Sequence, residues 1–285
     1  MQVITEANEF APRGAVVSIG MFDGVHRGHR RVLSLLRSRG REAGLPTVLV
    51  TFDPHPRAVI RPEGPPPLLS TLDDRIALLA ATGEVDTCLV LRFDKLRSAE
   101  SVETFVGDTL VAHLGMRALV VGENFACGRG RKGNVDYLRT LGTQWGYHVH
   151  PVALRAPADA GSGNHCSSSE TRRLIQLGEV SAAAALLERP HEITGTIAAA
   201  PSRSERAISV VLPVGMCMPA PDNYAGAVRR KEGALPWVPA ILQVRAEQAC
   251  GLPAVHLVTL EGIDAACGDR MALRFFHRAG ELAAA

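Results

Sequence analysis

Residues 16–29 have the sequence Val-Val-Ser-Ile-Gly-Met-Phe-Asp-Gly-Val-His-Arg-Gly-His, in which a buried-type strand leads through a glycine-rich turn into a helix. Gly20 and Gly24 bracket the turn, so the backbone can approach a ligand closely where a side chain would obstruct it. A helix that begins there directs unpaired amide hydrogens and a partial positive charge at the turn. The stretch therefore predicts a phosphate site at a strand-to-helix junction.

Two histidines, His26 and His29, lie at the start of this helix, and their spacing of three places them on one face. An imidazole can donate a hydrogen bond to a phosphate oxygen and, if protonated, also offsets charge that grows on a departing phosphate. The alternative is an ordinary capping turn in which both rings point into solvent. Because Gly20, Gly24 and Gly28 accompany the histidines directly after a strand, phosphate binding is the favoured interpretation.

Beyond this turn, short β-branched runs alternate with amphipathic stretches as far as about residue 152, which is typical of a parallel sheet flanked by helices. Strands are predicted at 16–19, 47–52, 88–91, 118–121 and 148–152. Helices are predicted at 30–39, 72–81, 101–114 and 135–145. The expected fold class is α/β, with a Rossmann-like parallel-sheet domain.

The character of the chain changes towards its C-terminal end. Residues 156–165 are rich in Gly, Ala, Pro and Asp and are predicted to form a mobile loop, which a helical pair at 170–177 and 181–187 follows. Strand-like runs then alternate with Gly and Pro turns, at 208–212, 241–244, 255–260 and 271–276. This pattern predicts a small antiparallel β-barrel-like domain. We expect two domains, 1–190 and 191–285.

Composition limits the classes of function. The 285 residues carry a formal charge of only +2, so no strong attraction for nucleic acid is expected. The longest apolar runs are far shorter than the roughly 20 residues of a membrane span, and the N-terminus lacks a signal-peptide pattern, so a cytoplasmic protein is expected. The six cysteines form no C-x-x-C pair, which predicts free thiols and no metal site built by the protein. The sequence does not predict an oligomeric state.

Two further segments follow predicted strands, on the edge where open α/β sheets bind ligands. Residues 52–56, Phe-Asp-Pro-His-Pro, form a rigid turn that could hold Asp53 and His55 as a site wall or be purely structural. Residues 122–133 combine glycines with three cations, as an anion-wrapping loop requires, although a solvated basic loop is the alternative.

A run of serines opens the helix predicted at 170–177. Ser167 and Ser168 could act only as helix caps. Together with Arg172 they could also hold the β- or γ-phosphate of a nucleotide. The two roles are compatible.

Taken together, these segments resemble the bacterial FAD synthetases, which combine riboflavin kinase and FMN adenylyltransferase modules. The resemblance rests on four motifs that occur in the family's order and cover roughly residues 14–195: residues 20–29, 51–56, 122–131 and 167–172. It implies that the N-terminal module joins AMP from ATP to the phosphate of FMN, giving FAD and pyrophosphate, with Mg²⁺ on the phosphates.

The resemblance also implies roles for individual residues. The implied catalytic residues are His26, His29 and Arg172. The implied ATP-binding residues are Gly20, Phe22, Asp23, Gly24, His29, Ser167, Ser168 and Arg172. The implied flavin-binding residues are Asp53, His55, Asn124 and Arg131.

The C-terminal region departs from the family. A riboflavin kinase module has a Pro-Thr-Ala-Asn motif that helps to bind Mg-ATP, and residues 194–213 contain no such motif. Where the family has a glutamate base, the approximate register places Ala254, which can accept no proton. We therefore predict a barrel without kinase activity. Two alternatives to FMN adenylylation stay open: nucleotidyl transfer to a flavin analogue or another phosphate ester, and a non-catalytic flavin or nucleotide sensor.

Overall fold

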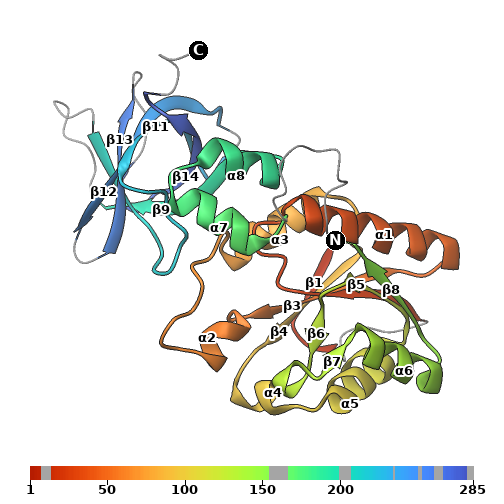
Figure 1. The fold of residues 1–285 in the computed structure, drawn as a ribbon. Coiled ribbons are helices and arrows are strands. Elements are labelled where there is room, and N and C mark those ends of the chain that lie inside the picture. Colours follow the sequence, from red (N-terminus) through yellow and green to blue (C-terminus); the bar gives the residue numbers. More distant parts are fainter. Residues whose placement is uncertain are drawn as a thin grey trace. The chain divides into compact units, whose positions relative to one another are not determined.

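A computed structural model describes residues 1–7, 14–153, 166–198, 207–233, 235–249, 252–259 and 266–280 (Figure 1). By compactness the chain divides into two units, one of residues 1–66 and 75–165 and one of residues 67–74 and 166–285. The mobile loop predicted at 156–165 lies outside the described residues.

The first unit is built on a six-stranded parallel sheet of order β1-β4-β3-β2-β5-β8. Its strands are β1 (Gln2–Ile4), β2 (Ala15–Ile19), β3 (Thr47–Asp53), β4 (Thr87–Arg92), β5 (Met116–Gly122) and β8 (His148–Val152). Every residue of β2 is buried, as expected for a central parallel strand that is covered on both faces. The predicted Rossmann-like fold class is confirmed.

Helices cover both faces of this sheet. α1 (Arg27–Ala43) contacts β2, β3 and β5 on one face. The opposite face buries Ile19, Val50 and Leu91 against Leu110 and Leu138, which belong to the helical segments listed next. These are α5 (Val102–Thr104), a π-helix (Phe105–His113) and α6 (Val135–Trp145). Figure 1 shows α1 on one side of the sheet and α5 and α6 on the other.

Short elements complete the unit. They are α2 (Pro56–Ile60), α3 (Leu72–Ala81), α4 (Lys95–Ala99), the strands β6 (Ala126–Cys127) and β7 (Gly133–Asn134), and a 3-10 turn (Arg129–Arg131). The first residues of α3, Leu72 to Asp74, are grouped with the second unit. The helix predicted at 101–114 becomes π-helical from Phe105, where Leu114 N donates to Thr109 O at 3.3 Å, a spacing of five residues.

The strand order fixes where a ligand can bind. The chain runs from β2 to β3 and β4 on one side, then returns to place β5 and β8 on the other. The topological switch point therefore lies between β2 and β5, and open α/β sheets bind ligands beyond the carboxyl ends of the strands at such a point. The turn after β2 and the loop after β5 both begin at this point.

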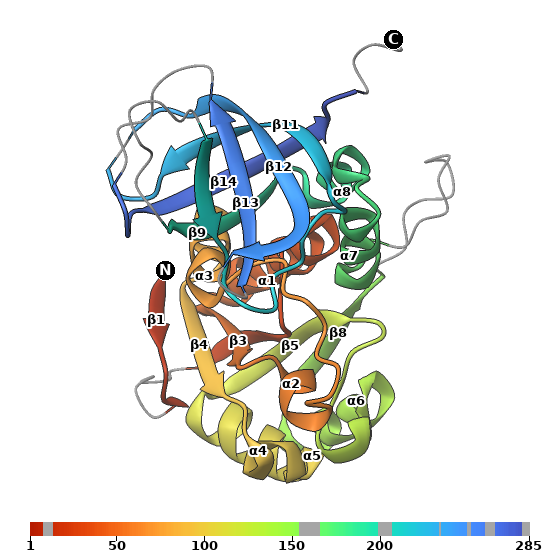
Figure 2. The same ribbon diagram turned by 90° about the vertical axis from the view of Figure 1, so that its left-hand side faces the viewer.

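The second unit contains a closed antiparallel barrel of order β10-β13-β12-β11-β14-β9, which confirms the predicted barrel-like fold (Figure 2). Its strands are β9 (His191–Ile197), β10 (Ala207–Val211), β11 (Asp222–Arg230), β12 (Val238–Ala249), β13 (Leu252–Thr259) and β14 (Arg270–Arg278). Tyr224, Leu242, Leu273 and Phe275 are among the fully buried side chains of its core.

The helices α7 (Ser168–Gln176) and α8 (Val180–Leu187) belong to this second unit by compactness. Val180 of α8 joins the barrel core, and Ser181 Oγ donates to the carbonyl of Phe276 in β14 at 3.0 Å. The boundary predicted at residue 190 places both helices in the first domain. The division into domains 1–190 and 191–285 stays a prediction.

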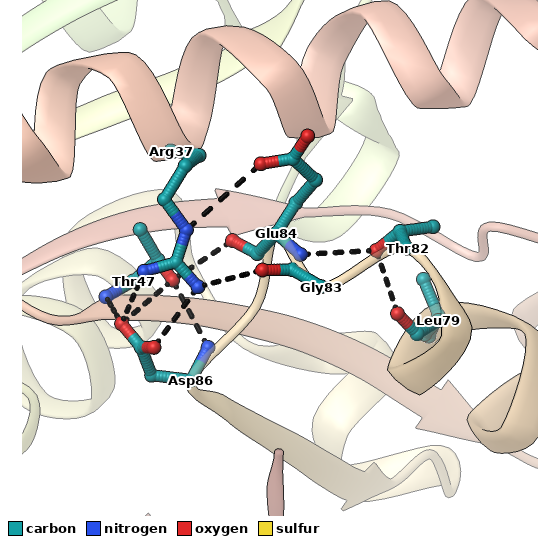
Figure 3. Close-up of polar contacts among 7 residues, drawn as sticks. All are labelled: Arg37, Thr47, Leu79, Thr82, Gly83, Glu84 and Asp86. Carbon is teal, nitrogen blue, oxygen red and sulfur yellow. Dashed lines mark hydrogen bonds and ion pairs between the residues drawn. The ribbon is translucent and has the colours of Figure 1, made fainter.

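A polar network holds the amino-terminal edge of the parallel sheet (Figure 3). The Asp86 carboxylate accepts from Thr47 N at 2.9 Å and from Thr47 Oγ1 at 3.0 Å. Arg37 of α1 donates to both carboxylate oxygens, at 2.9 and 3.1 Å. The network thereby fastens the starts of β3 and β4 to α1.

Replacing Asp86 with Asn should lower the free energy of unfolding by about 1 kcal/mol near neutral pH, because charge-assisted bonds are lost. The side chain is 42% exposed, so the effect is not expected to be larger. The matched control is Asp136→Asn, which breaks an ion pair whose carboxylate is 86% exposed and should cost less than about 0.5 kcal/mol.

The difference in the free energy of unfolding between the wild type and Asp86→Asn should also depend on pH. Burial raises the pKa of Asp86, but hydrogen bonds from Thr47 and Arg37 outweigh it and hold that pKa below its ordinary value. The stabilisation is complete above the unfolded-state pKa of about 3.9 and is lost as the pH falls through the lower folded-state pKa. Urea unfolding of the wild type and of Asp86→Asn, from neutral pH down through the carboxylate pKa range, tests the prediction. A difference in the free energy of unfolding that persists at the lowest pH would contradict it.

Candidate functional site

His26 and His29 lie together where β2 passes into α1. His26 is the N-cap of α1, and its Nδ1 accepts from the backbone N–H of His29 at 3.3 Å. The two rings are stacked, with centroids 3.6 Å apart and planes inclined by 15°. His26 is only 3% exposed, so its ring caps the helix without pointing into solvent.

The cap also fixes which nitrogen of His26 can donate. A neutral imidazole has one donor and one acceptor nitrogen. Because Nδ1 accepts the N–H of His29, the neutral ring carries its proton on Nε2. His26 can therefore donate a hydrogen bond from Nε2 without first being protonated, at the end of a helix that favours anions.

The turn before the histidines has an unusual backbone. Phe22, Gly24 and Val25 all have positive φ angles, of 49°, 76° and 41°. For a β-branched residue such as Val25 this region is disfavoured and persists only where the surroundings enforce it. Phe22 is 2% and Val25 0% exposed, and a Cβ on Gly20 would lie 3.0 Å from the Phe22 ring. Close packing therefore holds the turn in shape.

The segment after β3 supplies Asp53 and His55. Asp53 is exposed and ends the strand, and its carbonyl accepts from Phe93 N at 2.9 Å. His55 is the N-cap of α2 and accepts from Arg57 N at 3.1 Å. His55 thus has a clear structural role, which is compatible with a role as site wall.

The loop after β5 brings Asn124 and Arg131 together. Arg131 Nη2 donates to the carbonyl of Asn124 at 3.4 Å, and both residues are exposed. β6 and β7 pair as a small hairpin that closes the loop. The other predicted binding residues, Ser167, Ser168 and Arg172, lie in the second unit.

In that second unit, Ser167 is the N-cap of α7 and accepts from Glu170 N at 3.2 Å. Arg172 is 8% exposed, and its Nε donates to the carbonyl of Pro67 at 2.6 Å. Capping by Ser167, one of the two roles predicted for the serines, is therefore observed.

Comparison with known proteins adds to this geometry. A family model described as FAD synthetase matches residues 8–167, which is more than half of the chain. The chain belongs to the FAD synthetase family. Among its relatives, the bifunctional riboflavin kinase/FMN adenylyltransferase of Escherichia coli is 34% identical over 184 residues, which is 65% of this chain and 57% of the relative. The protein of the same name from Pseudomonas fluorescens is 38% identical over 200 residues, 69% of this chain and 62% of the relative.

One solved structure also resembles this FAD synthetase family member. The structure described as a macrolide-efflux protein from Streptococcus pneumoniae aligns with a TM-score of 0.81 at 21% identity, covering 97% of this chain and 89% of that one. At this level of identity the likeness concerns the fold. No helix in the described ranges has both the length and the apolar character needed to cross a membrane.

Sequence reasoning missed Arg75, which is only 3% exposed on α3. Its Nη2 donates to the carbonyl of Phe52 at 3.0 Å, next to Asp53. Burial lowers the pKa of Arg75, whereas the carboxylates of Asp23 and Asp53 act in the opposite direction. The sequence does contain a signal for this residue: Arg75 lies four positions before Leu79, so a helix places the two side chains on the same buried face.

The loop after β5 is held by a close contact that can be tested. A Cβ on Gly128 would lie 2.6 Å from Val102 Cγ2 and 2.9 Å from Val102 N, and Gly128 has a φ of 71°. Gly130 lies in the left-handed helical region, with a φ of 67° and a ψ of 16°, and nothing lies within 4 Å of its Cβ position. The ψ of 171° at Gly128 instead gives a conformation that is essentially restricted to glycine. Backbone strain and steric exclusion therefore both act at Gly128, whereas Gly130 carries only the milder backbone cost.

We expect Gly128→Ala to open the loop and Gly130→Ala to perturb it much less. Gly130→Ala carries the cost of the left-handed conformation, about 1 kcal/mol, whereas Gly128→Ala carries a larger backbone cost and also displaces Val102. Hydrogen–deuterium exchange of backbone amides in residues 122–134 measures the effect, with α1 amides as an internal reference. Equal exchange in the two variants would show that neither contact with Val102 nor the backbone conformation of Gly128 holds the loop.

Proposed function

We propose that this chain transfers the AMP group of ATP to the phosphate of FMN, giving FAD and pyrophosphate. The observation that carries the proposal is the stacked pair His26 and His29 at the N-terminus of α1, directly after a central parallel strand. Membership of the FAD synthetase family supports it. The matches cover 57% and 62% of the length of two bifunctional relatives, so activity and substrates are proposals for this chain.

In the proposed reaction, a phosphate oxygen of FMN attacks the α-phosphorus of ATP in line. A new P–O bond forms, the bond between the α-phosphorus and the bridging oxygen breaks, and pyrophosphate leaves with that oxygen. Such a transfer needs chiefly positioning and charge stabilisation rather than a covalent intermediate. His26 would donate from Nε2, and the amides at the start of α1 would face the phosphates.

The remaining residues take the supporting roles that the family resemblance implies. Gly20, Phe22, Asp23 and Gly24 would form the turn against which the triphosphate lies. The residues proposed for the far end of the triphosphate are Ser167, Ser168 and Arg172. The residues proposed for the flavin side are Asp53, His55, Asn124 and Arg131.

Mg²⁺ is proposed to arrive with ATP, as MgATP. This ion is commonly held by substrate phosphates and only one or two carboxylates, rather than by a cage of protein ligands. In the described part of the chain, no three His, Cys, Asp or Glu side chains are grouped to hold a metal ion. The donor set therefore suits a metal bound through the nucleotide. A cytoplasmic location, where ATP is available, is part of the same proposal, as is the absence of a nucleic-acid partner.

We further propose that the barrel does not phosphorylate riboflavin. Residues 194–213 lack the Pro-Thr-Ala-Asn motif, and Ala254 occupies a position in β13 opposite Val211 of β10. Alanine offers no base to a ribityl hydroxyl.

Mass spectrometry of the products tests both parts of the proposal. With ATP and FMN we expect FAD and pyrophosphate, and with ATP and riboflavin we expect no FMN. Failure to form FAD would contradict the main proposal. Transfer to another phosphate ester would then support an altered acceptor, and binding of ATP and FMN without pyrophosphate release would support a sensor. Formation of FMN at a comparable rate would contradict the loss of kinase activity.

Variants of His26 should separate capping from catalysis. His26→Ala removes the cap and should lower the free energy of unfolding by about 1 kcal/mol, whereas His26→Asn supplies a new side-chain acceptor for His29 N and should restore most of it. Both variants lose the Nε2–H donor and should reduce the rate of FAD formation by about 10²-fold, as loss of a charge-stabilising donor does. Urea unfolding and steady-state rates measure the two effects. Normal turnover in His26→Asn would show that His26 serves only as a cap.

A further inference from the structure

Arg75 is a buried cation that the proposed reaction has not so far used. Its guanidinium lies on the inner side of α3 with 3% exposure, and one N–H group, at Nη2, donates to the carbonyl of Phe52. Its Nε is buried and has no hydrogen-bond partner within the residues that the structure describes. Burial of a charge is costly unless an opposite charge compensates it. The position of Arg75 therefore calls for an electrostatic explanation.

The compensating charges come from the two turns that border the site. Asp23 is fully buried in the turn after β2, and Asp53 ends β3. Both carboxylates favour the charged form of Arg75. An uncompensated carboxylate at Asp23 would repel a triphosphate placed against the same turn. The charge of Arg75 acts against that repulsion, because Arg75 and Asp23 attract each other.

Hydrogen bonds connect the same turns mechanically. Thr51 Oγ1 donates to the carbonyl of Met21 in the turn after β2, at 3.2 Å. The next residue along β3, Phe52, offers its carbonyl to Arg75 at 3.0 Å. The end of β3 is thus bonded to the turn on one side and to α3 on the other.

We propose that Arg75 is a positioning residue for the nucleotide: it fastens the end of β3 and offsets the buried charge of Asp23, so that the triphosphate can approach the turn after β2. This inference rests on the proposed function in taking ATP as the ligand. Arg75 acts through Asp23 and Phe52 and not by contact with the reacting atoms. Its loss should therefore weaken ATP binding more than it slows the bound complex.

The test is a double-mutant cycle read by calorimetric titration of the full-length protein with ATP in the presence of Mg²⁺. Arg75→Gln removes the charge but keeps an N–H donor, and Arg75→Lys keeps the charge. Asp23→Asn removes the carboxylate charge, alone and together with Arg75→Gln. The control is Arg37→Met, which breaks the Asp86 network at the other end of β3.

We expect Arg75→Gln to weaken ATP binding about tenfold or more, within the range measured for coupled charged pairs, and to raise the KM for ATP more than it lowers kcat. Arg75→Lys should retain most of the affinity. In the Asp23→Asn background, Arg75→Gln should change ATP affinity by less than about threefold, since the charge that needed compensation is gone. Arg37→Met should lower the unfolding temperature and leave ATP affinity unchanged.

Unchanged ATP affinity in Arg75→Gln would overturn the inference, and so would an equal loss with and without Asp23→Asn. If Arg75→Gln alone does not fold, Asp23→Asn is compared with the double variant, and a loss of ATP affinity larger than about threefold in the double variant would overturn the inference. A wild type that binds ATP through Arg75 but forms no FAD would contradict the proposed function alone. A wild type that does not bind ATP would overturn both.

Discussion

The turn between β2 and α1 is the constraint on which the first unit depends. Phe22 and Val25 adopt backbone conformations that are disfavoured for their side chains, and both are almost completely buried. Burial of the two side chains holds the strained backbone in place. The next residue, His26, is consequently placed at the N-cap of α1, with its ring stacked on that of His29. Packing energy in the core thus fixes the geometry of polar groups at the edge of the sheet.

Much of the fold could be predicted because local signals coincide with element boundaries. The helix at 135–145 was predicted with both ends correct: Asn134 caps it by accepting from Tyr137 N, and Gly146 ends it in the left-handed conformation. The strand at 148–152 was also correct. Elements defined by distant partners were missed. β1 has only three residues and exists through pairing with β4, and β11 begins with polar residues and contains Gly226.

Gly226 illustrates why the barrel strands are hard to recognise locally. A Cβ at this position would lie 2.2 Å from the carbonyl of Arg274 in the neighbouring strand β14. The residue therefore permits a close approach of two backbones. In the sequence alone, a glycine at such a position weakens the pattern that predicts a strand. The same limitation applies at the site. His26 and His29 could be predicted because they lie three residues apart in one motif. The role of Arg75 depends instead on Asp23 and Phe52, which are more than twenty residues away in the sequence.

The two ends of β3 show how stability and proposed function are divided within one strand. At its start, Thr47 and Arg37 both donate to the Asp86 carboxylate, and the side chain of Arg37 is 20% exposed. At its other end, Arg75 is only 3% exposed, and its guanidinium donates to a neutral acceptor, the carbonyl of Phe52. An ion pair of carboxylate and guanidinium contributes modest stability, whereas a deeply buried charge costs stability unless it is compensated and is typical of sites that bind a ligand. The deep burial of Arg75 at the carboxyl end of β3 therefore fits the proposed site at that edge of the sheet.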